Sequence, residues 1–119
     1  EYPELTLVGL AGGEMQKAAA TYQLNFLAEA FIDRAYLANG QLAPRSLIGS
    51  VYSDPQTCIQ QVLDMLQGKS ITSLATEALP SQTIQVKAQT FCLHGDGEKA
   101  LPLAKALQQS LLDAGYQLA

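Results

Sequence analysis

Two short, almost continuously apolar runs constrain the fold of this chain more than any other feature. They are residues 5–10 and residues 91–93, and each is followed by a glycine-containing turn and a helix-like segment. A run without regular polar alternation is typical of a strand that is covered on both faces, as in a parallel sheet. We therefore predict an α/β fold with mostly parallel strands, in which both runs are buried.

The rest of the chain alternates in the same way, with helical spacing of apolar residues in some segments and strand-like runs in others. Ser53-Asp54-Pro55 is the clearest boundary, because it supplies an N-cap and a proline at the first helical position. The other predicted elements are a helix over 14–22, a strand over 25–30, a loop over 33–52, a helix from 55 to 68, a small hairpin or irregular segment over 71–80, a half-exposed strand over 82–87, a helix from about 99 to 115 and the start of a strand at 116–118.

Composition limits the class of protein. The 119 residues are 48% apolar, enough for the core of one domain, and the net charge of −4 provides no basic surface for nucleic acid or an anionic membrane. No apolar stretch approaches the length of a membrane span. Cys58 and Cys92 lack metal-ligand spacing and are expected to be buried thiols in a reducing compartment. We predict a cytoplasmic protein that binds neither nucleic acid nor membranes.

A carboxylate lies inside the predicted second strand. Burying Glu29 is costly unless the group is paired or functional. Glu29 is therefore a candidate site acid or ligand, with Asp33 and Arg34 at the rim of the site. A structural ion pair between Arg34 and either carboxylate explains the same residues, and the sequence alone leaves both interpretations open.

The long loop contains a candidate anion-binding residue. Pro44 stiffens the backbone just before Arg45, whose guanidinium can clamp a carboxylate or phosphate in a bidentate manner. A solvated loop arginine is the commoner case.

The only histidine, His94, follows the apolar run 91–93 directly and begins the sequence His94-Gly95-Asp96. Ligands in α/β folds bind where strands end, so His94 is a candidate acid/base or metal ligand, with Asp96 orienting it or sharing its role. Alternatively, Asp96 caps the following helix and His94 is bonded inside the fold. Cys92 shares a face with His94, but nothing activates its thiol and a packing role is favoured.

A glycine-containing turn follows the first apolar run, over residues 9–13. Such a turn before a helix can hold a phosphate, but this one lacks the spacing of known phosphate-binding loops. We therefore interpret it as a tight turn.

Several segments, taken in order, resemble the C-terminal half of the LamB/YcsF family, which includes the A subunit of bacterial 5-oxoprolinase. They are Glu-Ala-Phe-Ile-Asp-Arg-Ala-Tyr at 29–36, Leu-Ala-Pro-Arg at 42–45, Ser-Asp-Pro at 53–55 and Phe-Cys-Leu-His-Gly-Asp at 91–96. The opening residues 5–12 also fit the family pattern, so the resemblance covers essentially the whole chain.

The resemblance implies a distorted (β/α) barrel about twice as long as this chain, similar to sugar-deacetylase and glycoside-hydrolase-like barrels, with residues 1–119 as a single domain forming its C-terminal half. It implies ATP-dependent opening of the lactam ring of 5-oxo-L-proline to L-glutamate, together with the B and C subunits of 5-oxoprolinase. The resemblance leaves open whether a divalent metal is required, and His94 is the only histidine that could be a metal ligand.

The family's N-terminal motifs, rich in aspartate, asparagine, histidine and lysine, are absent, and the chain opens at Glu1 without methionine. We therefore expect a piece of a longer polypeptide, inactive by itself, with exposed strand edges and apolar surface. In the complete site, Glu29 would position water or pair with Arg34. Arg34 or Arg45 would clamp the substrate carboxylate or a phosphate, and Asp33 is a further candidate for binding substrate or phosphate.

Two other functions are compatible with the residues. One is a metal-dependent amidase or deacetylase-like hydrolase that works without ATP, which metal analysis and ATP dependence would distinguish. The other is a non-catalytic α/β module that binds partner subunits, which the absence of a pocket at His94 would favour.

Overall fold

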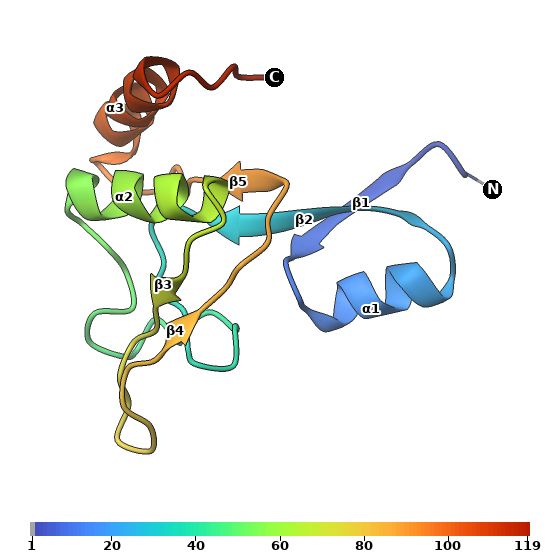
Figure 1. The fold of residues 1–119 in the computed structure, drawn as a ribbon, viewed down its shortest axis with the longest axis horizontal. Helices are drawn as coiled ribbons and strands as arrows, with labels where there is room; N and C mark the ends of the chain where they lie inside the picture. The colour runs from blue at the N-terminus through green and yellow to red at the C-terminus, as the bar shows by residue number, and fades with distance from the viewer. Residues whose placement is uncertain (1) are drawn as a thin grey trace.

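The centre of the fold is a three-stranded parallel sheet, seen in a computed structural model that describes residues 2–119. The elements, in chain order, are β1 (Thr6–Leu10), α1 (Glu14–Thr21), β2 (Asn25–Phe31), α2 (Pro55–Leu66), β3 (Ile71–Thr72), β4 (Thr83–Ile84), β5 (Thr90–Cys92) and α3 (Ala100–Asp113) (Figure 1). The strand order is β1-β2-β5, and both pairings are parallel. The predicted α/β fold with a parallel sheet is therefore confirmed, whereas barrel closure stays a prediction.

A separate antiparallel hairpin joins β3 to β4, with Ile71 opposite Ile84. Of the two alternatives predicted for 71–80, the irregular segment is found at 73–80, whereas the hairpin closes later in the chain. The strand predicted over 82–87 is reduced to its two residues Thr83 and Ile84.

One face of the sheet is better covered than the other, mainly along the end of β2. Ala28 and Ala30 of β2 are buried, whereas Phe31, which alternates with them, is half-buried. In β1, Leu7 is 39% and Val8 49% exposed. The prediction that the first run is buried is therefore wrong, because β1 pairs only with β2 among the described residues and lies at the sheet edge. The same finding confirms the expected exposure of a strand edge and apolar surface.

Helix α1 packs closely on the covered face because Gly9 has no side chain. A Cβ atom at Gly9 would lie 2.8 Å from the Sδ atom of Met15 and 3.1 Å from the ring of Phe26. This close approach fixes α1 against β1 and β2.

Helix α2 begins as the sequence predicts. The Asp54 carboxylate accepts a hydrogen bond from the Thr57 N–H at 3.0 Å, and Pro55 is the first helical residue. Hydrogen bonds from Thr57 lower the pKa of Asp54. The helix ends before Gly68, whose φ of 71° is the left-handed conformation that glycine adopts readily.

Helix α3 starts after Lys99, so Pro102 falls in its first turn, where a missing N–H is tolerated. Lys99 is the N-cap residue and makes no capping hydrogen bond, so the alternative in which Asp96 caps this helix is wrong. Residues 116–118 form no strand in the described chain, because the Tyr116 N–H bonds back to the Leu111 carbonyl at 2.9 Å and closes the helix end.

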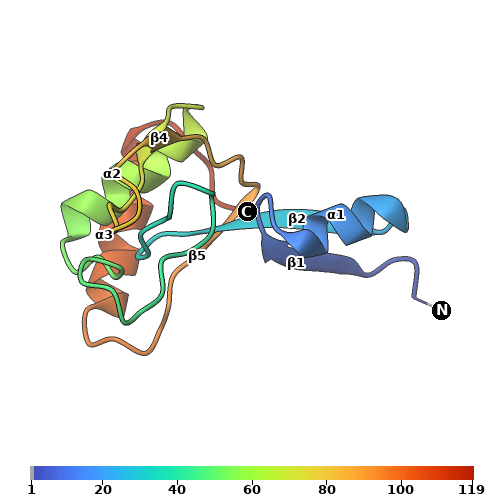
Figure 2. The same cartoon turned by 90° about the horizontal axis from the view of Figure 1, so that it is seen from below.

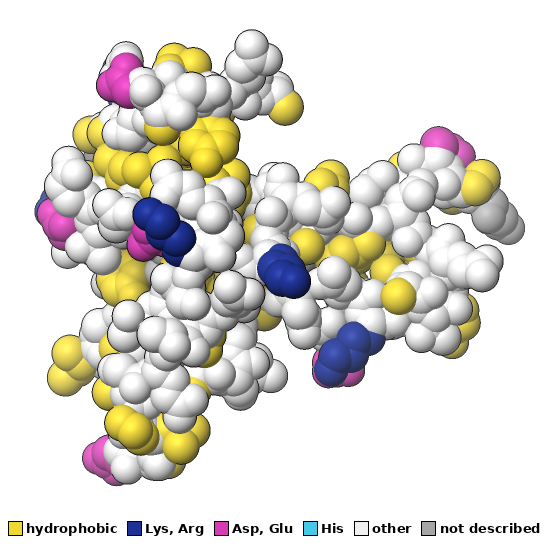
Figure 3. All heavy atoms as spheres, in the orientation of Figure 1, with side chains coloured by type: hydrophobic (Ala, Val, Ile, Leu, Met, Phe, Trp, Pro, Cys, Tyr) yellow, Lys and Arg dark blue, Asp and Glu magenta, His cyan; other side chains and the backbone are white. Residues whose placement is uncertain are grey.

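The elements form two regions that lie at opposite ends of β2, as Figures 1 and 2 show. We call β1, α1 and the first part of β2 (residues 5–27) the arm, and the end of β2 with α2, α3, β5 and the β3–β4 hairpin (residues 28–116) the body. Apolar side chains gather between α2 and α3 and also along the arm (Figure 3). No helix within residues 2–119 is long and apolar enough to cross a membrane.

Candidate functional site

Asp33 and His94 meet where β2 and β5 end. In the parallel register, Phe31 lies opposite Cys92. Asp33 and His94 each follow that pair by two residues, so they leave the sheet side by side. The Nδ1 atom of His94 lies 2.9 Å from the Oδ1 atom of Asp33. Two residues separated by 61 positions in the sequence thus form a hydrogen-bonded pair.

The imidazole ring is held on two sides. It stacks on Phe31, with ring centroids 5.3 Å apart and an interplanar angle of 11°. The side chains of His94 and Asp33 are 26% and 15% exposed. Because a carboxylate accepts at Nδ1, we assign the Nδ1–H tautomer, which leaves the lone pair on Nε2 available. Within residues 2–119, Nε2 has no hydrogen-bond partner.

The turn that carries Asp33 is fixed by buried groups of the body. The Phe31 N–H donates to the hydroxyl of the fully buried Tyr36 at 2.9 Å, and burial raises the pKa of Tyr36 to about 12. The Asp33 carbonyl accepts from the Tyr52 N–H at 2.9 Å. Burial also raises the pKa of Tyr52, so both phenols stay neutral at physiological pH.

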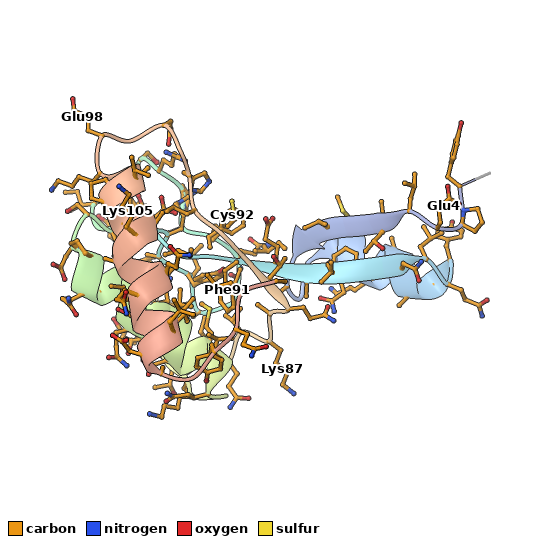
Figure 4. The ribbon with its side chains drawn as sticks, turned by 90° about the horizontal axis from the view of Figure 1, so that it is seen from above. Glu4, Lys87, Phe91, Cys92, Glu98 and Lys105 are labelled. Carbon is orange, nitrogen blue, oxygen red and sulfur yellow. The ribbon has the colours of Figure 1, made fainter. Side chains whose placement is uncertain are left out.

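A pocket of about 420 Å³ opens beside the pair. Its lining brings together the predicted residues Asp33, Arg45, His94 and Asp96, and adds Lys99. Glu98, also in the lining, lies at the outer tip of the loop before α3 (Figure 4). The pocket therefore combines an acid/base candidate with cationic groups that can bind an anion.

Arg34 lies outside this pocket. It is 8% exposed, and its Nη2 atom donates to the Ala43 carbonyl at 2.6 Å. It forms no ion pair with Glu29 or Asp33 in the described chain, so the alternative of a structural ion pair is wrong there. The contact with Ala43 instead holds the loop that leads to Arg45.

Glu29 lies on the face of β2 that carries Phe31, two residues before it. It does not line the pocket beside His94.

Partial burial raises the pKa of the Cys92 thiol, and the charges of Glu29 and Asp33 act in the same direction. Cys92 therefore stays a neutral thiol at physiological pH and is a poor nucleophile.

Residues 2–119 alone build neither a metal centre of three or more ligands nor a phosphate cradle at the glycine turn. Residues 2–119 contain no group of three His, Cys, Asp or Glu side chains placed to hold a metal ion. At the glycine turn, the Gly12 N–H donates to the Gln16 side chain at 2.7 Å and the Gly13 N–H to the Leu10 carbonyl at 3.0 Å. The tight turn is thus confirmed, because both glycine amides are already bonded.

A larger hollow, of about 600 Å³, opens beside that turn. Among its charged residues, Glu14 and Lys17 are paired with each other at 2.6 Å and are highly exposed. Exposed pairs of this kind are weak and mobile, whereas the Asp33–His94 pair is partly buried and stacked. We therefore place the candidate site at His94.

The sequence model of the LamB/YcsF family matches residues 1–119. This chain belongs to the LamB/YcsF family. It is similar to the crystal structure of the lactam utilization protein from Thermus thermophilus, with 34% sequence identity and a TM-score of 0.79. The match covers 98% of this chain and 44% of that protein, so the chain spans less than half of the solved structure.

The sequence of this LamB/YcsF chain indicates Asp33 only as a residue at the rim of the site. The structure makes Asp33 the partner of His94, and Asp96 lines the same pocket without bonding to the imidazole in the described chain. Two buried residues, Tyr36 and Gln61, were missed altogether. Gln61 carried a signal, because it is a polar residue between the buried Cys58 and Met65 on the inner face of α2.

Proposed function

We propose that this chain supplies part of the active site of an enzyme that opens the lactam ring of 5-oxo-L-proline to give L-glutamate, with coupled ATP hydrolysis and with the B and C subunits of 5-oxoprolinase as partners. Membership of the LamB/YcsF family supports the class of substrate. The observation that carries the catalytic assignment is the Asp33–His94 pair beside a pocket that also contains Arg45.

The pair has the chemistry that amide hydrolysis needs. In the proposed reaction, Nε2 of His94 takes a proton from water while the water oxygen bonds to the ring carbonyl carbon. The carbon–nitrogen bond then breaks, and His94 returns the proton to the departing nitrogen, which becomes the amine of glutamate. Asp33 holds the tautomer and stabilises the imidazolium that forms between the two steps. Arg45 binds the substrate carboxylate.

ATP, when bound, would phosphorylate the amide oxygen and make the ring carbon more open to water, and the phosphoryl group would leave as inorganic phosphate. Within residues 2–119, neither the glycine turn at 12–13 nor the His94 pocket fits a polyphosphate. The N–H groups of Gly12 and Gly13 already donate hydrogen bonds within the protein. The His94 pocket is lined by three carboxylates, those of Asp33, Asp96 and Glu98, and by only two cations, Arg45 and Lys99. We therefore assign no contact with ATP to this chain, and the ATP requirement rests on the family alone.

The pocket also bears on the alternatives. A non-catalytic module has no need of a hydrogen-bonded Asp–His pair at the mouth of a pocket, so the geometry favours catalysis. A hydrolase that works without ATP uses the same pair, and ATP dependence of glutamate formation separates it from the proposed enzyme.

The test uses the complete polypeptide that carries this chain, assembled with its partner subunits. We expect His94→Gln to lower kcat for glutamate formation by roughly 10²- to 10⁴-fold, the usual range for a general acid/base. Arg45→Gln should mainly raise KM for 5-oxoproline. The control is Lys105→Gln, an exposed change on α3 (Figure 4) at a residue that does not line the pocket. Glutamate formation within about twofold of wild type in His94→Gln, measured in parallel with the control, would disprove the assignment.

A further inference from the structure

We infer that Gln61 is a positioning residue for the Asp33–His94 pair: its buried amide clamps the backbone on both sides of Asp33. The geometric part of this inference stands on the structure alone, whereas its consequence for catalysis rests on the proposed function.

Gln61 reaches the turn after β2 from the inner face of α2. The side chain is buried, with 7% of the residue exposed. Its Nε2 atom lies 3.0 Å from the Phe31 carbonyl oxygen, 3.0 Å from the Arg34 carbonyl oxygen and 3.4 Å from the Ile32 carbonyl oxygen. The bonded carbonyls therefore belong to residues on both sides of Asp33.

The amide orientation follows from chemistry. A carbonyl oxygen only accepts hydrogen bonds, so the group that faces these oxygens must be the NH₂ of Gln61 and not its oxygen. A glutamate at position 61 would place a carboxylate against the same oxygens. A methionine has similar length but no donor, and it would leave buried carbonyls without partners.

The clamp acts on the one stretch of backbone that sets the direction of the Asp33 side chain. The Asp33 carbonyl is already bonded to the Tyr52 N–H, and the Ile32 N–H to the Cys92 carbonyl at 3.0 Å. The two N–H groups of the Gln61 amide bond the Phe31 and Arg34 carbonyls, and the Ile32 carbonyl lies at the longer distance of 3.4 Å. With the backbone fixed in this way, the Asp33 carboxylate stays within hydrogen-bond distance of Nδ1 of His94. Loss of the clamp lets the turn shift, and a shift of about 1 Å is enough to break that bond.

The experiment follows the His94 tautomer. Long-range ¹H–¹⁵N spectra of the complete polypeptide show which ring nitrogen carries the proton, and the His94 signals are assigned by their loss in His94→Gln. We expect the Nδ1–H form in wild type and a mixture dominated by Nε2–H in Gln61→Met. In the same variant, kcat should fall roughly ten- to hundredfold while KM for 5-oxoproline changes less than about threefold.

The matched control is Gln60→Met. Gln60 is the preceding residue of α2, but it is exposed and its amide bonds only to the Asp64 carboxylate at 2.9 Å. We expect Gln60→Met to keep the Nδ1–H tautomer and the wild-type kcat.

If folded Gln61→Met keeps the Nδ1–H tautomer of His94, the inference is overturned, whatever its rate of glutamate formation. An altered tautomer with unchanged glutamate formation supports the positioning role and instead contradicts the proposed function. If Gln61→Met does not fold, wild-type hydrogen exchange decides. The side-chain amide protons of Gln61 should exchange at least about tenfold more slowly than those of Gln60, and equal rates overturn the inference.

Discussion

The arm of this LamB/YcsF chain and the core between α2 and α3 in the body differ in how far they bury large apolar side chains. In the body, Val62 of α2 and Leu107 of α3 are 1% and 7% exposed and belong to one core cluster. In the arm, Val8 of β1 and Leu24 before β2 are 49% and 52% exposed. Large apolar residues such as Val62 and Leu107 thus stabilise the α2–α3 core of the body through burial, whereas Val8 and Leu24 contribute mainly exposed surface in the arm.

This difference explains where a rigid site can form. The partners that fix Asp33 and His94 are Tyr36, Tyr52 and Gln61, and all three belong to the body. The arm provides β1, whose outer edge has no strand partner within residues 2–119. Precise positioning of side chains needs a packed surrounding, so the candidate site lies at the body end of β2.

The largest expected effect tests the difference in packing directly. Leu107→Ala should lower the free energy of unfolding by about 3 kcal/mol, because it opens a cavity in the core between α2 and α3. Leu24→Ala, the same change at an exposed position of the arm, should cost less than about 1 kcal/mol. Urea denaturation followed by circular dichroism gives both values. Equal losses would show that arm and body are packed alike.

A smaller effect tests the junction between the two regions. Tyr36→Phe removes the acceptor for the Phe31 N–H and should cost about 1–3 kcal/mol at neutral pH, because a buried donor is left without a partner. Denaturation at pH 7, compared with the exposed control Tyr22→Phe, measures this loss.

The pH dependence of the same residue has a definite sign. The folded pKa of Tyr36, about 12, lies above the ordinary tyrosine value of 10.0, so folding favours the neutral phenol. Its contribution to stability is complete below pH 10 and is lost as the pH rises through 12. Wild type should therefore lose more stability than Tyr36→Phe over this interval, and parallel curves would contradict the burial of the phenol.

Sequence patterns predicted the elements better than the site. Helices α1, α2 and α3 and strand β2 form where periodicity and the Asp54 cap place them, because these signals are local. The Asp33–His94 pair joins residues 61 positions apart, and the sequence suggested the nearby Asp96 as the partner instead. Which aspartate pairs with His94 depends on the register of β2 against β5, and a single sequence does not reveal that register. The apolar pattern of β1 also did not predict its exposure. An apolar run is the same whether the strand lies in the centre of a sheet or at an uncovered edge.

The smallest expected effect on stability comes from the arm itself. Val8→Lys adds a charge to the half-exposed face of β1 and should change the free energy of unfolding of the 119-residue chain by less than about 0.5 kcal/mol. It should also reduce self-association, because a lysine on an edge strand discourages pairing with a second strand. Sedimentation velocity of wild type and Val8→Lys measures this change, with Val8→Thr as a control that alters the same side chain without adding a charge. The same substitution can be measured in a longer polypeptide that contains this chain. If Val8→Lys lowers the free energy of unfolding there by several kcal/mol, but not in the 119-residue chain, further strands cover Val8 in the longer protein. The contrast between arm and body would then belong to this segment alone.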